Sequence, residues 1–291
     1  MSTSDTSIDN TTGIAGEQSP VPMRYTTLNT GAKIPLVGFG VYQVPPAQTK
    51  QAVLEALKAG YRLIDTAEYY RNEREVGQAI REAGQTLGIP RDQIFVTTKL
   101  PPQSSYQAAA RRIQESYEAL DCGPIDLMII HWPGSANVET YRAPEDALKG
   151  GKLKAIGLSS FYGAEYQEIL DRCDIVPALD QDETHVFRQQ LDFQPVLEKH
   201  GTKLESWSPF AEGAHDVFRN PTLAAIARKH GMTIAQVMLR YFVDRGIIVI
   251  PKTVHADRMR ENIDLFRPGF ELDDEDRAAI RGLDRNRSLW E

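Results

Sequence analysis

The sequence predicts an α/β protein that folds as a (β/α)8 TIM barrel with a parallel, eight-stranded core. Three observations support this: eight short apolar runs recur along the chain, stretches with helical spacing separate most of them, and no linker interrupts the alternation after Arg24. Alternating strands and helices form parallel sheets with crossover helices. Eight such units in roughly 250 residues match the size of a (β/α)8 barrel.

The eight predicted strands are the apolar, β-like runs. They are expected at 33–42, 61–67, 93–100, 125–132, 153–160, 176–183, 202–209 and 246–253. Helical spacing is expected at 48–60, 73–85, 105–120, 163–172 and 233–246. Gly60, Gly201 and Gly246 follow helix-like segments, at positions where glycine often caps a helix C-terminus.

A doubly wound open sheet is the alternative fold. Its dinucleotide-binding form carries the pattern G-x-G-x-x-G after the first strand. This chain has GFGVYQ in that region, which does not fit the spacing. The barrel is therefore favoured.

The chain is expected to contain one barrel domain, at 24–291, behind a polar leader at 1–23. The leader is rich in Ser, Thr, Asp, Asn and Gly, and its first 22 residues contain no arginine. It has no apolar core, so it resembles neither a secretory signal nor a transit peptide. We expect it to be disordered.

Composition narrows the possible partners. The net charge is -7 and the pI is about 5.5, so no basic field exists to hold a nucleic acid. The apolar runs are too short to span a membrane. The two cysteines, Cys122 and Cys173, form no CxxC pair, which is typical of a reduced cytoplasmic protein. No segment stands out as an interface, so we expect a monomer.

Polar residues interrupt the apolar strands at their C-terminal ends. In a barrel these ends meet at one face, where function gathers. Each residue alone could be a helix cap, a surface charge or a core histidine, but together they would converge on one cavity. They are Asp65, Tyr70, Lys99, His131, Ser159, Ser160, Gln181, Glu183, Trp207, Ser208, Lys252 and Thr253.

A metal site is one interpretation of this ring. Asp65, His131, Glu183 and His185 are all ligand types, and Glu183 and His185 share a strand face. However, no strand carries the H-x-H or H-x-x-E spacing that would fix two ligands on one ion. We therefore expect no metal, and keep a metal-dependent barrel hydrolase as a weaker alternative.

A phenol beside a lysine and an acid suits carbonyl reduction. Tyrosine has a reference pKa of about 10, too high for easy proton exchange at neutral pH. A nearby ammonium lowers that pKa, and an aspartate offsets the cost of burying the lysine. A histidine can orient the substrate oxygen. Such a set would protonate a carbonyl oxygen while a cofactor supplies hydride to the carbon. These residue types alone do not choose between Tyr69 and Tyr70.

The segment IPKTVHADRMREN, at 250–262, offers a place for that cofactor. It runs from a strand end into a helix, and a helix N-terminus favours phosphate. Lys252, Thr253 and Arg258 could surround a phosphate there. The alternative is a solvated charged face, which is what most charge runs are.

The most strongly patterned stretch, at 60–77, reads GYRLIDTAEYYRNEREVG. It resembles the pattern Y-R-x-I-D-T-A-x-x-Y-x-N-E-x-x-V-G of the aldo-keto reductase family. Further blocks follow in the family's order: TTKL, DLMIIHWP, GKLKAIGLSSF, PALDQDETH, ESWSPF and IPKTVHADRMREN. The resemblance covers about Tyr25 to Trp290. GFGVYQVPP, at 38–46, is most similar to the short-tailed bacterial branch often labelled 2,5-diketo-D-gluconate reductases.

The resemblance implies a catalytic tetrad of Asp65, Tyr70, Lys99 and His131. Tyr70 would be the general acid, because the family's tyrosine lies five positions after its aspartate, and Tyr69 would then be a packing neighbour. Lys99 would lower the pKa of Tyr70, Asp65 would hold the lysine, and His131 would orient the substrate. Glu183 would lie close to Lys99.

The resemblance also implies NADPH or NADP+ as cofactor. The residues that would hold it are Ser159, Ser160, Gln181, Trp207, Ser208, Phe210, Lys252, Thr253, Arg258, Glu261 and Asn262. Trp207 would stack on the nicotinamide, and Glu261 and Asn262 would meet the adenine. Glu212 would lie near the pyrophosphate, which is unfavourable unless its carboxylate points to solvent.

The sequence thus predicts an NADPH-dependent oxidoreductase that reduces a small aldehyde or ketone to an alcohol. Tyr42, Trp132 and Trp290 are the expected substrate-pocket residues. The alternative is a non-catalytic NADPH-binding barrel that acts as a sensor or subunit, and the complete tetrad favours the enzyme.

Several positions depart from the family pattern. Ser160 stands where most relatives have asparagine, and Pro101 where many have tryptophan. Asp180 and Asp182 add unexplained negative charge to the sixth predicted strand. Pro144 is expected to shorten its helix at the N-terminal side.

Overall fold

Eight parallel strands form the core of the protein in the computed structural model, which describes residues 23–290. In sheet order they run from the last strand back to the first, each paired with its neighbour in sequence. They are β3 (Phe39–Gly40), β4 (Leu63–Asp65), β5 (Phe95–Leu100), β6 (Leu127–Ile130), β7 (Ile156–Ser159), β8 (Leu179–Glu183), β9 (Lys203–Trp207) and β10 (Ile248–Val249).

The two ends of the sheet meet, which closes the barrel. Val37 and Val249 form a parallel bridge, and the backbone N–H of Gly38 donates to the Val249 carbonyl at 2.8 Å. Further along, Gly40 donates to the carbonyl of Pro251 at 3.3 Å. A Cβ at Gly40 would lie 3.0 Å from the carbonyl oxygen of Ile250. A larger residue at this position would therefore push the closing strands apart.

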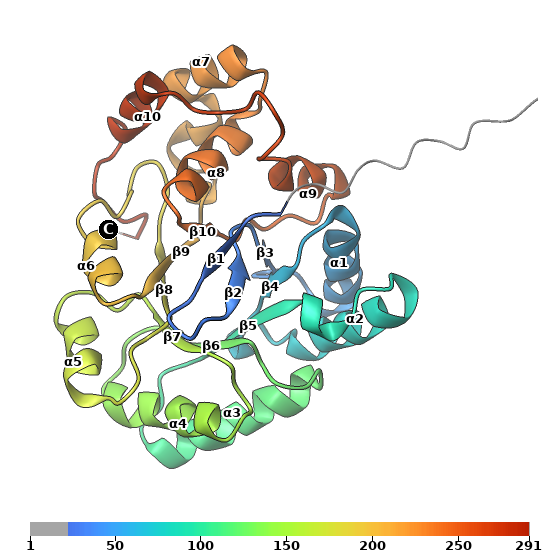
Figure 1. The fold of residues 1–291 in the computed structure, drawn as a ribbon, viewed down its shortest axis with the longest axis vertical. Helices are drawn as coiled ribbons and strands as arrows, with labels where there is room; N and C mark the ends of the chain where they lie inside the picture. Colours follow the sequence, from blue (N-terminus) through green and yellow to red (C-terminus); the bar gives the residue numbers. More distant parts are fainter. Residues whose placement is uncertain (1–22, 291) are drawn as a thin grey trace, which may run out of the picture.

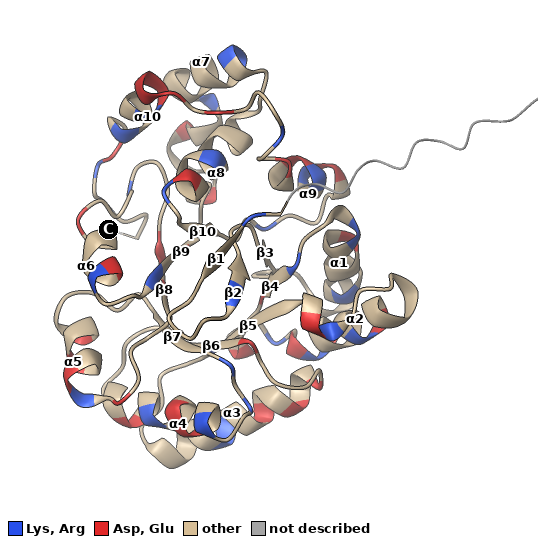
Figure 2. Ribbon diagram, in the orientation of Figure 1, with Lys and Arg blue, Asp and Glu red and all other residues tan. Residues whose placement is uncertain are grey.

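Helices surround the barrel, as Figure 1 shows. They are α1 (Pro46–Ala59), α2 (Glu73–Thr86), α3 (Tyr106–Leu120), α4 (Asn137–Lys149), α5 (Ala164–Arg172), α6 (Gln194–Lys199), α7 (Pro221–His230), α8 (Ile234–Asp244), α9 (Ala256–Ile263) and α10 (Asp274–Arg281). Short 3-10 helices are η1 (Glu68–Tyr70) and η2 (Arg91–Gln93). The segment η3 (Ala211–Arg219) is helical only at its two ends, with non-helical backbone from Glu212 to Asp216 between them. Many Lys, Arg, Asp and Glu residues lie on these outer helices (Figure 2). No helix in the described part of the chain is long and apolar enough to cross a bilayer.

The predicted barrel is confirmed, and each predicted strand run contains an observed strand. Gly60 caps α1 as expected: its φ is 111°, and its N–H bonds back to the carbonyls of Ala56 and Leu57. The expectation for Pro144 is wrong, because α4 continues through it from Asn137 to Lys149. Pro144 is buried, so packing of this helix outweighs the missing backbone donor.

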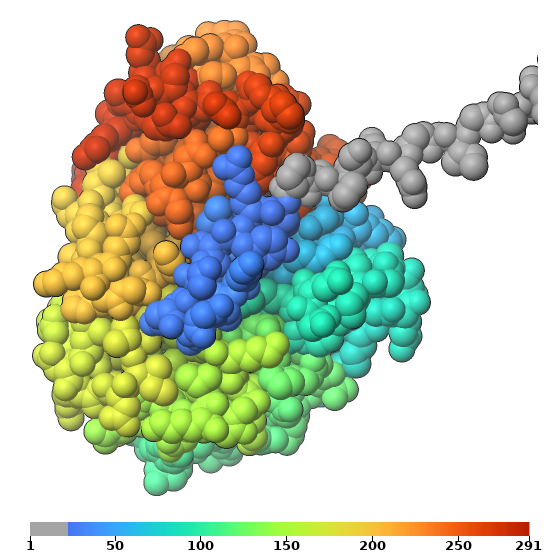
Figure 3. Space-filling model, viewed as in Figure 1, coloured from blue at the N-terminus to red at the C-terminus, as the bar shows by residue number. Residues whose placement is uncertain are grey.

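The first predicted run, at 33–42, does not form one strand. Its start, β2 (Lys33–Pro35), pairs with β1 (Tyr25–Thr27) in an antiparallel hairpin, and only its end joins the barrel as β3. The hairpin borders a second cavity together with Arg62, Phe95 and Lys154, which lie at or before the starts of barrel strands. It therefore covers the N-terminal end of the barrel, and Figure 3 shows it across the face nearest the viewer.

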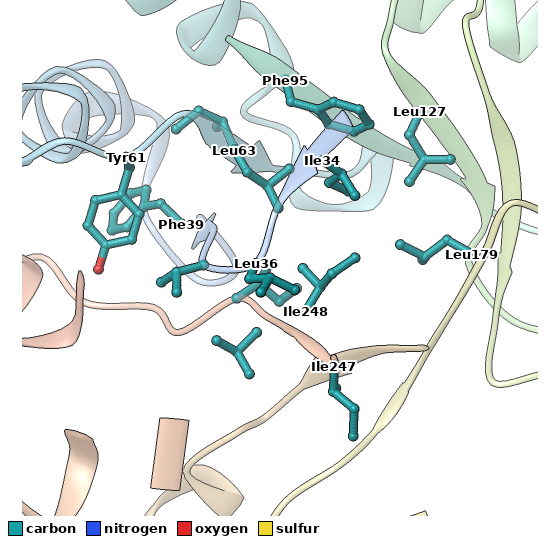
Figure 4. Packing of buried hydrophobic residues seen from close by; sticks show 14 of the residues in the cluster. Ile34, Leu36, Phe39, Tyr61, Leu63, Phe95, Leu127, Leu179, Ile247 and Ile248 are labelled. Carbon is teal, nitrogen blue, oxygen red and sulfur yellow. The ribbon is translucent and has the colours of Figure 1, made fainter. Parts of the chain in front are cut away.

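Apolar side chains of the hairpin segment fill that end of the barrel. Ile34 and Leu36 pack among Leu63, Phe95 and Ile248, as Figure 4 shows. Met23, which the predicted boundary placed in the leader, is half-buried against the same core. The rest of the leader, at 1–22, lies outside the described residues.

Candidate active site

A cavity of about 560 Å³ opens at the C-terminal ends of the barrel strands. This volume is within the usual range for small-molecule sites. The predicted site residues that line it are Tyr42, Asp65, Tyr70, His131, Trp132, Ser159, Ser160, Gln181, Trp207, Ser208, Phe210, Lys252 and Trp290. The structure thus brings together most residues of the predicted set.

A buried ion pair lies at the base of this cavity. Asp65 ends β4 and Lys99 lies near the end of the neighbouring strand β5. The Lys99 ammonium, fully buried, donates to Asp65 Oδ1 at 2.5 Å and to the carbonyl of Thr66 at 2.9 Å. Burial works to lower the pKa of Lys99, but Asp65 and Tyr70 outweigh it and raise that pKa. Lys99 therefore keeps its positive charge.

Tyr70 lies over this ion pair, at the end of η1. The Lys99 Nζ is 4.8 Å from the centre of the Tyr70 ring. Burial raises the pKa of Tyr70, and the charge of Lys99 opposes this only in part. Lys99 thus lowers the pKa of Tyr70 as expected, but burial has the larger effect and the net pKa is raised. Tyr70 is a protonated phenol at neutral pH.

His131 follows β6 and faces Tyr70. The two ring centres are 5.7 Å apart in an edge-to-face arrangement. Burial and then the charge of Lys99 lower the pKa of His131 to about 2, so the ring is neutral. Within the described residues its Nδ1 is buried without a hydrogen-bond partner. A neutral ring can hold a substrate oxygen without adding charge.

Gln181, on β8, links the ion pair to a second buried acid. Its amide nitrogen donates to Asp65 Oδ2 at 3.0 Å and to Glu205 Oε2 at 3.2 Å. Glu205 lies opposite Gln181 in the register of β9 and is fully buried. Burial and then the charge of Asp65 raise the pKa of Glu205 to about 8. The two acids accept from both N–H groups of the Gln181 side chain. The side-chain carbonyl oxygen of Gln181 therefore remains available as an acceptor.

Ser159 and Ser160 border the cavity at the end of β7. Ser160 has a φ of 60°, and its N–H donates to the Gln181 carbonyl oxygen of the backbone at 3.2 Å. This contact ties the loop after β7 to β8. The Ser160 residue itself lines the cavity at this position.

Asp180 and Asp182 flank Gln181 on β8 and are fully buried. Their carboxyl oxygens have no hydrogen-bond partner among the described residues. Burial raises the pKa of Asp182 to about 7, and burial with the charge of Asp182 raises that of Asp180 well above its usual range. The extra negative charge read from the sequence is thus reduced at neutral pH, because Asp180 is protonated and Asp182 is partly protonated.

The loop after β9 forms one rim of the cavity. Ser208, Ala211 and Glu212 all have positive φ values near 50°, which L-residues adopt rarely. The Ser208 hydroxyl donates to Glu212 Oε1 at 3.2 Å, and both residues line the cavity. Glu212 therefore places a carboxylate at the cavity wall.

The other predicted cofactor residues lie outside the cavity, along the segment from β10 into α9. Thr253 is buried, and its hydroxyl oxygen accepts from the His255 N–H at 3.2 Å. Glu261 accepts from the Thr233 hydroxyl at 2.7 Å, and Asn262 is buried. Of this segment's predicted cofactor residues, only Lys252 reaches the cavity wall. Arg258 lies on α9 beyond it.

Comparison with known proteins decides the family. Residues 36–285 match the model of the aldo/keto reductase family. The chain belongs to the aldo/keto reductase family. It is 39% identical to an aldo-keto reductase of Mycolicibacterium smegmatis, over 90% of this chain and 94% of that protein. It is 36% identical to the glyoxal reductase of Bacillus subtilis, over 89% of this chain and 92% of that protein.

Solved structures agree with this assignment. A mutant of Gox0644 in complex with NADPH superimposes with a TM-score of 0.84 and 37% identity, over 91% of this chain and 94% of that one. The aldo-keto reductase of Brucella melitensis gives a TM-score of 0.84 and 38% identity, over 90% of this chain and 100% of that one. The resemblance found in the sequence motifs is therefore confirmed at the level of the family, but the 2,5-diketo-D-gluconate reductase branch stays a prediction.

Glu183 has a different position in this aldo/keto reductase from the one the motifs implied. It was expected beside Lys99, but its Oε1 accepts from the Leu289 N–H at 2.8 Å and its Oε2 from the Ser288 hydroxyl at 2.6 Å. Glu205 is the acid near Lys99 instead. Glu183 therefore anchors the C-terminal segment that carries Trp290.

Two further donors complete the environment of Glu183. The ring of His185 bonds to Oε1 at 2.9 Å and Arg188 to Oε2 at 3.0 Å. Burial works to raise the pKa of Glu183, but the hydrogen bonds and the charge of Arg188 outweigh it and lower that pKa to about 2. No cluster of three potential metal-binding side chains occurs in the described residues. Glu183, which bonds to His185, holds the C-terminal tail, whereas Asp65 pairs with Lys99.

Sequence reasoning missed part of the cavity wall. Tyr69, expected to be a packing neighbour, is 63% exposed and lines the cavity, with its ring 5.8 Å from that of Trp132. Glu205 was also missed. Side chains alternate between the two faces of a strand, so Glu205 lies on the same face of β9 as Trp207. This alternation could have identified Glu205 from the sequence.

Proposed function

We propose that the protein reduces an aldehyde or ketone to an alcohol with NADPH, and that Tyr70 is the general acid. The observation that carries this proposal is the buried Lys99–Asp65 pair beneath a protonated Tyr70, with a neutral His131 beside it. Family membership and a B. subtilis relative named glyoxal reductase support carbonyl reduction.

The residues present fit NADPH. Lys252 and Arg258 are cations near the N-terminus of α9, where backbone N–H groups also favour a phosphate. Two acids of this segment have other partners: Glu261 accepts from Thr233, and Asp264 lies 3.7 Å from Arg267. Asp257 lies beside Arg258 in the first turn of α9. Within residues 23–290 neither Lys252 nor Arg258 forms an ion pair, which suits a 2′-phosphate. The NADPH complex of Gox0644 supports the same cofactor.

The other predicted residues, at the ends of different strands, would each bind a different part of the cofactor. The Gln181 carbonyl oxygen would accept from the carboxamide, together with Ser159 and Ser160. Trp207 would pack against the nicotinamide ring, and Ser208 with the backbone near Phe210 would meet the pyrophosphate. Thr253 would join the 2′-phosphate site, and Glu261 and Asn262 would border the adenine.

The bound cofactor supplies a hydride to the carbonyl carbon. His131 would donate a hydrogen bond to the carbonyl oxygen and orient it, which its neutral ring can do. Tyr70 would pass its hydroxyl proton to that oxygen as negative charge develops there. The Lys99 ammonium would stabilise the resulting phenolate, and Asp65 and the Thr66 carbonyl hold the ammonium in place. Tyr70 regains its proton from water.

The Tyr70→Phe variant tests the assignment. It removes the proton donor but keeps the ring, so kcat should fall by about 10²–10⁴-fold, the usual share of general acid catalysis. Titration of NADPH fluorescence should show unchanged cofactor binding. The matched control is Tyr69→Phe, because Tyr69 lines the same cavity but does not lie over Lys99. Its kcat should remain within an order of magnitude of the wild type.

Near wild-type turnover in Tyr70→Phe would contradict the assignment, as would a larger loss in Tyr69→Phe. The competing function is a non-catalytic NADPH-binding barrel. Absence of NADPH oxidation with a panel of small aldehydes, in wild-type protein that binds NADPH, would favour that alternative.

A further inference from the structure

Exposed aromatic side chains gather on the substrate side of the cavity. The described residues include nine exposed large hydrophobic side chains, and four of these line this one cavity. They are Tyr42, Tyr69, Trp132 and Trp290, exposed by 45%, 63%, 37% and 72%. Scattered exposed hydrophobics need no explanation, but a cluster of four around one opening marks a contact surface.

These side chains come from different parts of the fold and contact one another and the tetrad. The Tyr42 ring centre lies 5.1 Å from that of Tyr70, and that of Tyr69 lies 5.8 Å from that of Trp132. Trp132 also lies 4.5 Å from His131. Trp290 reaches the cavity because Glu183 holds the tail through Ser288 and Leu289. The rim is therefore built around the atoms proposed to react.

This side of the cavity offers no free positive charge. Of the residues that line the cavity, only Lys252 is a lysine or arginine, and it lies on the β10 side that we assign to the cofactor. His131 is neutral, because burial and the charge of Lys99 lower its pKa to about 2. The charge of Lys99 is offset by Asp65 at 2.5 Å.

The cavity as a whole carries negative charge. Glu212 lines its wall on the loop after β9, Asp65 is paired with Lys99, and the whole chain has a net charge of -7. A carboxylate on the substrate would lose hydration on entering and would find no cationic partner among these residues. Burial of an unpaired charge is strongly unfavourable, whereas an apolar or aromatic body gains from contact with the rim.

We propose that the cavity selects uncharged carbonyl compounds with an apolar or aromatic body and discriminates against carboxylates. This inference rests on the proposed function and adds a rule for its substrates. It runs against the sugar-acid substrates that the similarity to 2,5-diketo-D-gluconate reductases would imply. The aromatic rim contributes the attraction, and the absence of a free cation contributes the discrimination.

A matched pair of aldehydes tests the rule. Methyl 4-formylphenoxyacetate and 4-formylphenoxyacetate differ in charge, and a methylene spacer keeps the reactivity of their aldehydes similar. With wild-type protein and NADPH at pH 7.5, kcat/KM for the ester should exceed that for the acid by about tenfold or more. Equal kcat/KM values for the two would overturn the rule while leaving the reductase function intact.

Two variants distinguish the effect of a charge in the cavity from the effect of the protein's overall charge. Trp290→Arg adds a cation at the rim, and the acid-to-ester ratio of kcat/KM should rise by about tenfold. Val176→Arg adds the same charge at an exposed position before β8, at the opposite end of the barrel, and should leave the ratio unchanged. An equal rise in both variants, or no rise in Trp290→Arg, would overturn the assignment to the rim. Failure of both aldehydes to oxidise NADPH would overturn the rule together with the proposed function.

Discussion

Tyr69 and Tyr70 are neighbours in sequence but differ in environment. Tyr70 packs over the Lys99 ammonium, whereas Tyr69 is exposed at the rim beside Trp132. The residue types alone could not separate them, and the family pattern chose Tyr70 by its distance from Asp65. The geometry supports that choice, because only Tyr70 is placed where Lys99 can stabilise its phenolate.

Glu205 is a buried acid that the fold keeps protonated. Its ordinary pKa is 4.5, and burial with the charge of Asp65 raises the folded value to about 8. Between these two pH values the folded protein must hold a proton that the unfolded chain has released. The contribution of Glu205 to stability is thus fully present below about pH 4.5 and is lost as the pH rises towards about 8.

The Glu205→Gln variant should remove this pH dependence. The amide is neutral at every pH and can still accept from Gln181, so the variant should gain stability relative to the wild type as pH rises from 5 to 8. Urea unfolding at several pH values measures the difference. The free energy of unfolding of Glu205→Gln should still depend on pH, but less steeply than that of the wild type. Some dependence remains because burial also raises the pKa values of Asp180 and Asp182.

Glu165→Gln serves as the control, since Glu165 is exposed on α5. Its stability difference from the wild type should be within about 0.5 kcal/mol and independent of pH. A constant difference for Glu205→Gln across the same range would show that Glu205 is ionised in the folded protein.

At the scale of elements, β8 connects the buried acids at the base of the cavity to the C-terminal tail. Gln181, in its middle, binds Asp65 and Glu205, and Glu183, at its end, binds Ser288 and Leu289. The same strand therefore orders both the base of the cavity and the segment that carries one rim aromatic.

Removal of one tail contact should affect substrate binding more than the chemical step. In Ser288→Ala the hydroxyl that donates to Glu183 at 2.6 Å is lost, and hydrogen bonds to charged groups contribute about 1.5–3 kcal/mol. Trp290 would then be held less firmly at the rim. KM for methyl 4-formylphenoxyacetate should rise by up to about tenfold, with kcat and NADPH affinity little changed. Steady-state kinetics and NADPH titration measure these quantities.

Thr86→Ala is a suitable control for this change. Thr86 is exposed, and among residues 23–290 its hydroxyl bonds only to the Glu82 carbonyl within α2, so its removal should leave KM as in the wild type. An equal KM for Ser288→Ala and the wild type would mean that the tail does not hold Trp290 against the substrate.

For the whole molecule, the alternation of strands and helices was enough to predict the barrel, because each unit has a local periodicity. The motifs located Asp65, Tyr70, Lys99 and His131 at one face, since strand ends meet there in any barrel. The placement of these residues therefore follows from the order of residues along the chain.

Features that depend on packing between distant segments do not follow from that order. Glu183 was placed beside Lys99 because strand position alone does not say which neighbours a side chain meets, and it binds a tail more than 100 residues away in sequence. The β1–β2 hairpin was hidden in one apolar run that divides between two sheets. Lys99 lowers the pKa of Tyr70 as expected, but the larger opposite effect of burial depends on packing and could not be predicted from the sequence.

The hairpin leads to a prediction about the whole fold. Ile34, on β2, is fully buried against Leu63 and Phe95 at the N-terminal end of the barrel (Figure 4). Ile34→Ala should lower the free energy of unfolding by about 2–5 kcal/mol, the usual cost of such a cavity. The reaction cavity lies at the other end of the strands, so kcat of the folded variant should match the wild type.

Urea unfolding and kinetics on the same preparations would measure both quantities. Thr27→Ala, an exposed change on the partner strand β1, is the matched control and should alter stability by no more than about 0.5 kcal/mol. If Ile34→Ala were as stable as this control, the hairpin would be an appendage outside the cooperative core. If stability fell and kcat fell with it, the two ends of the barrel would be coupled, because packing at the closed end would then be needed to hold Asp65 and Lys99 in register at the open one.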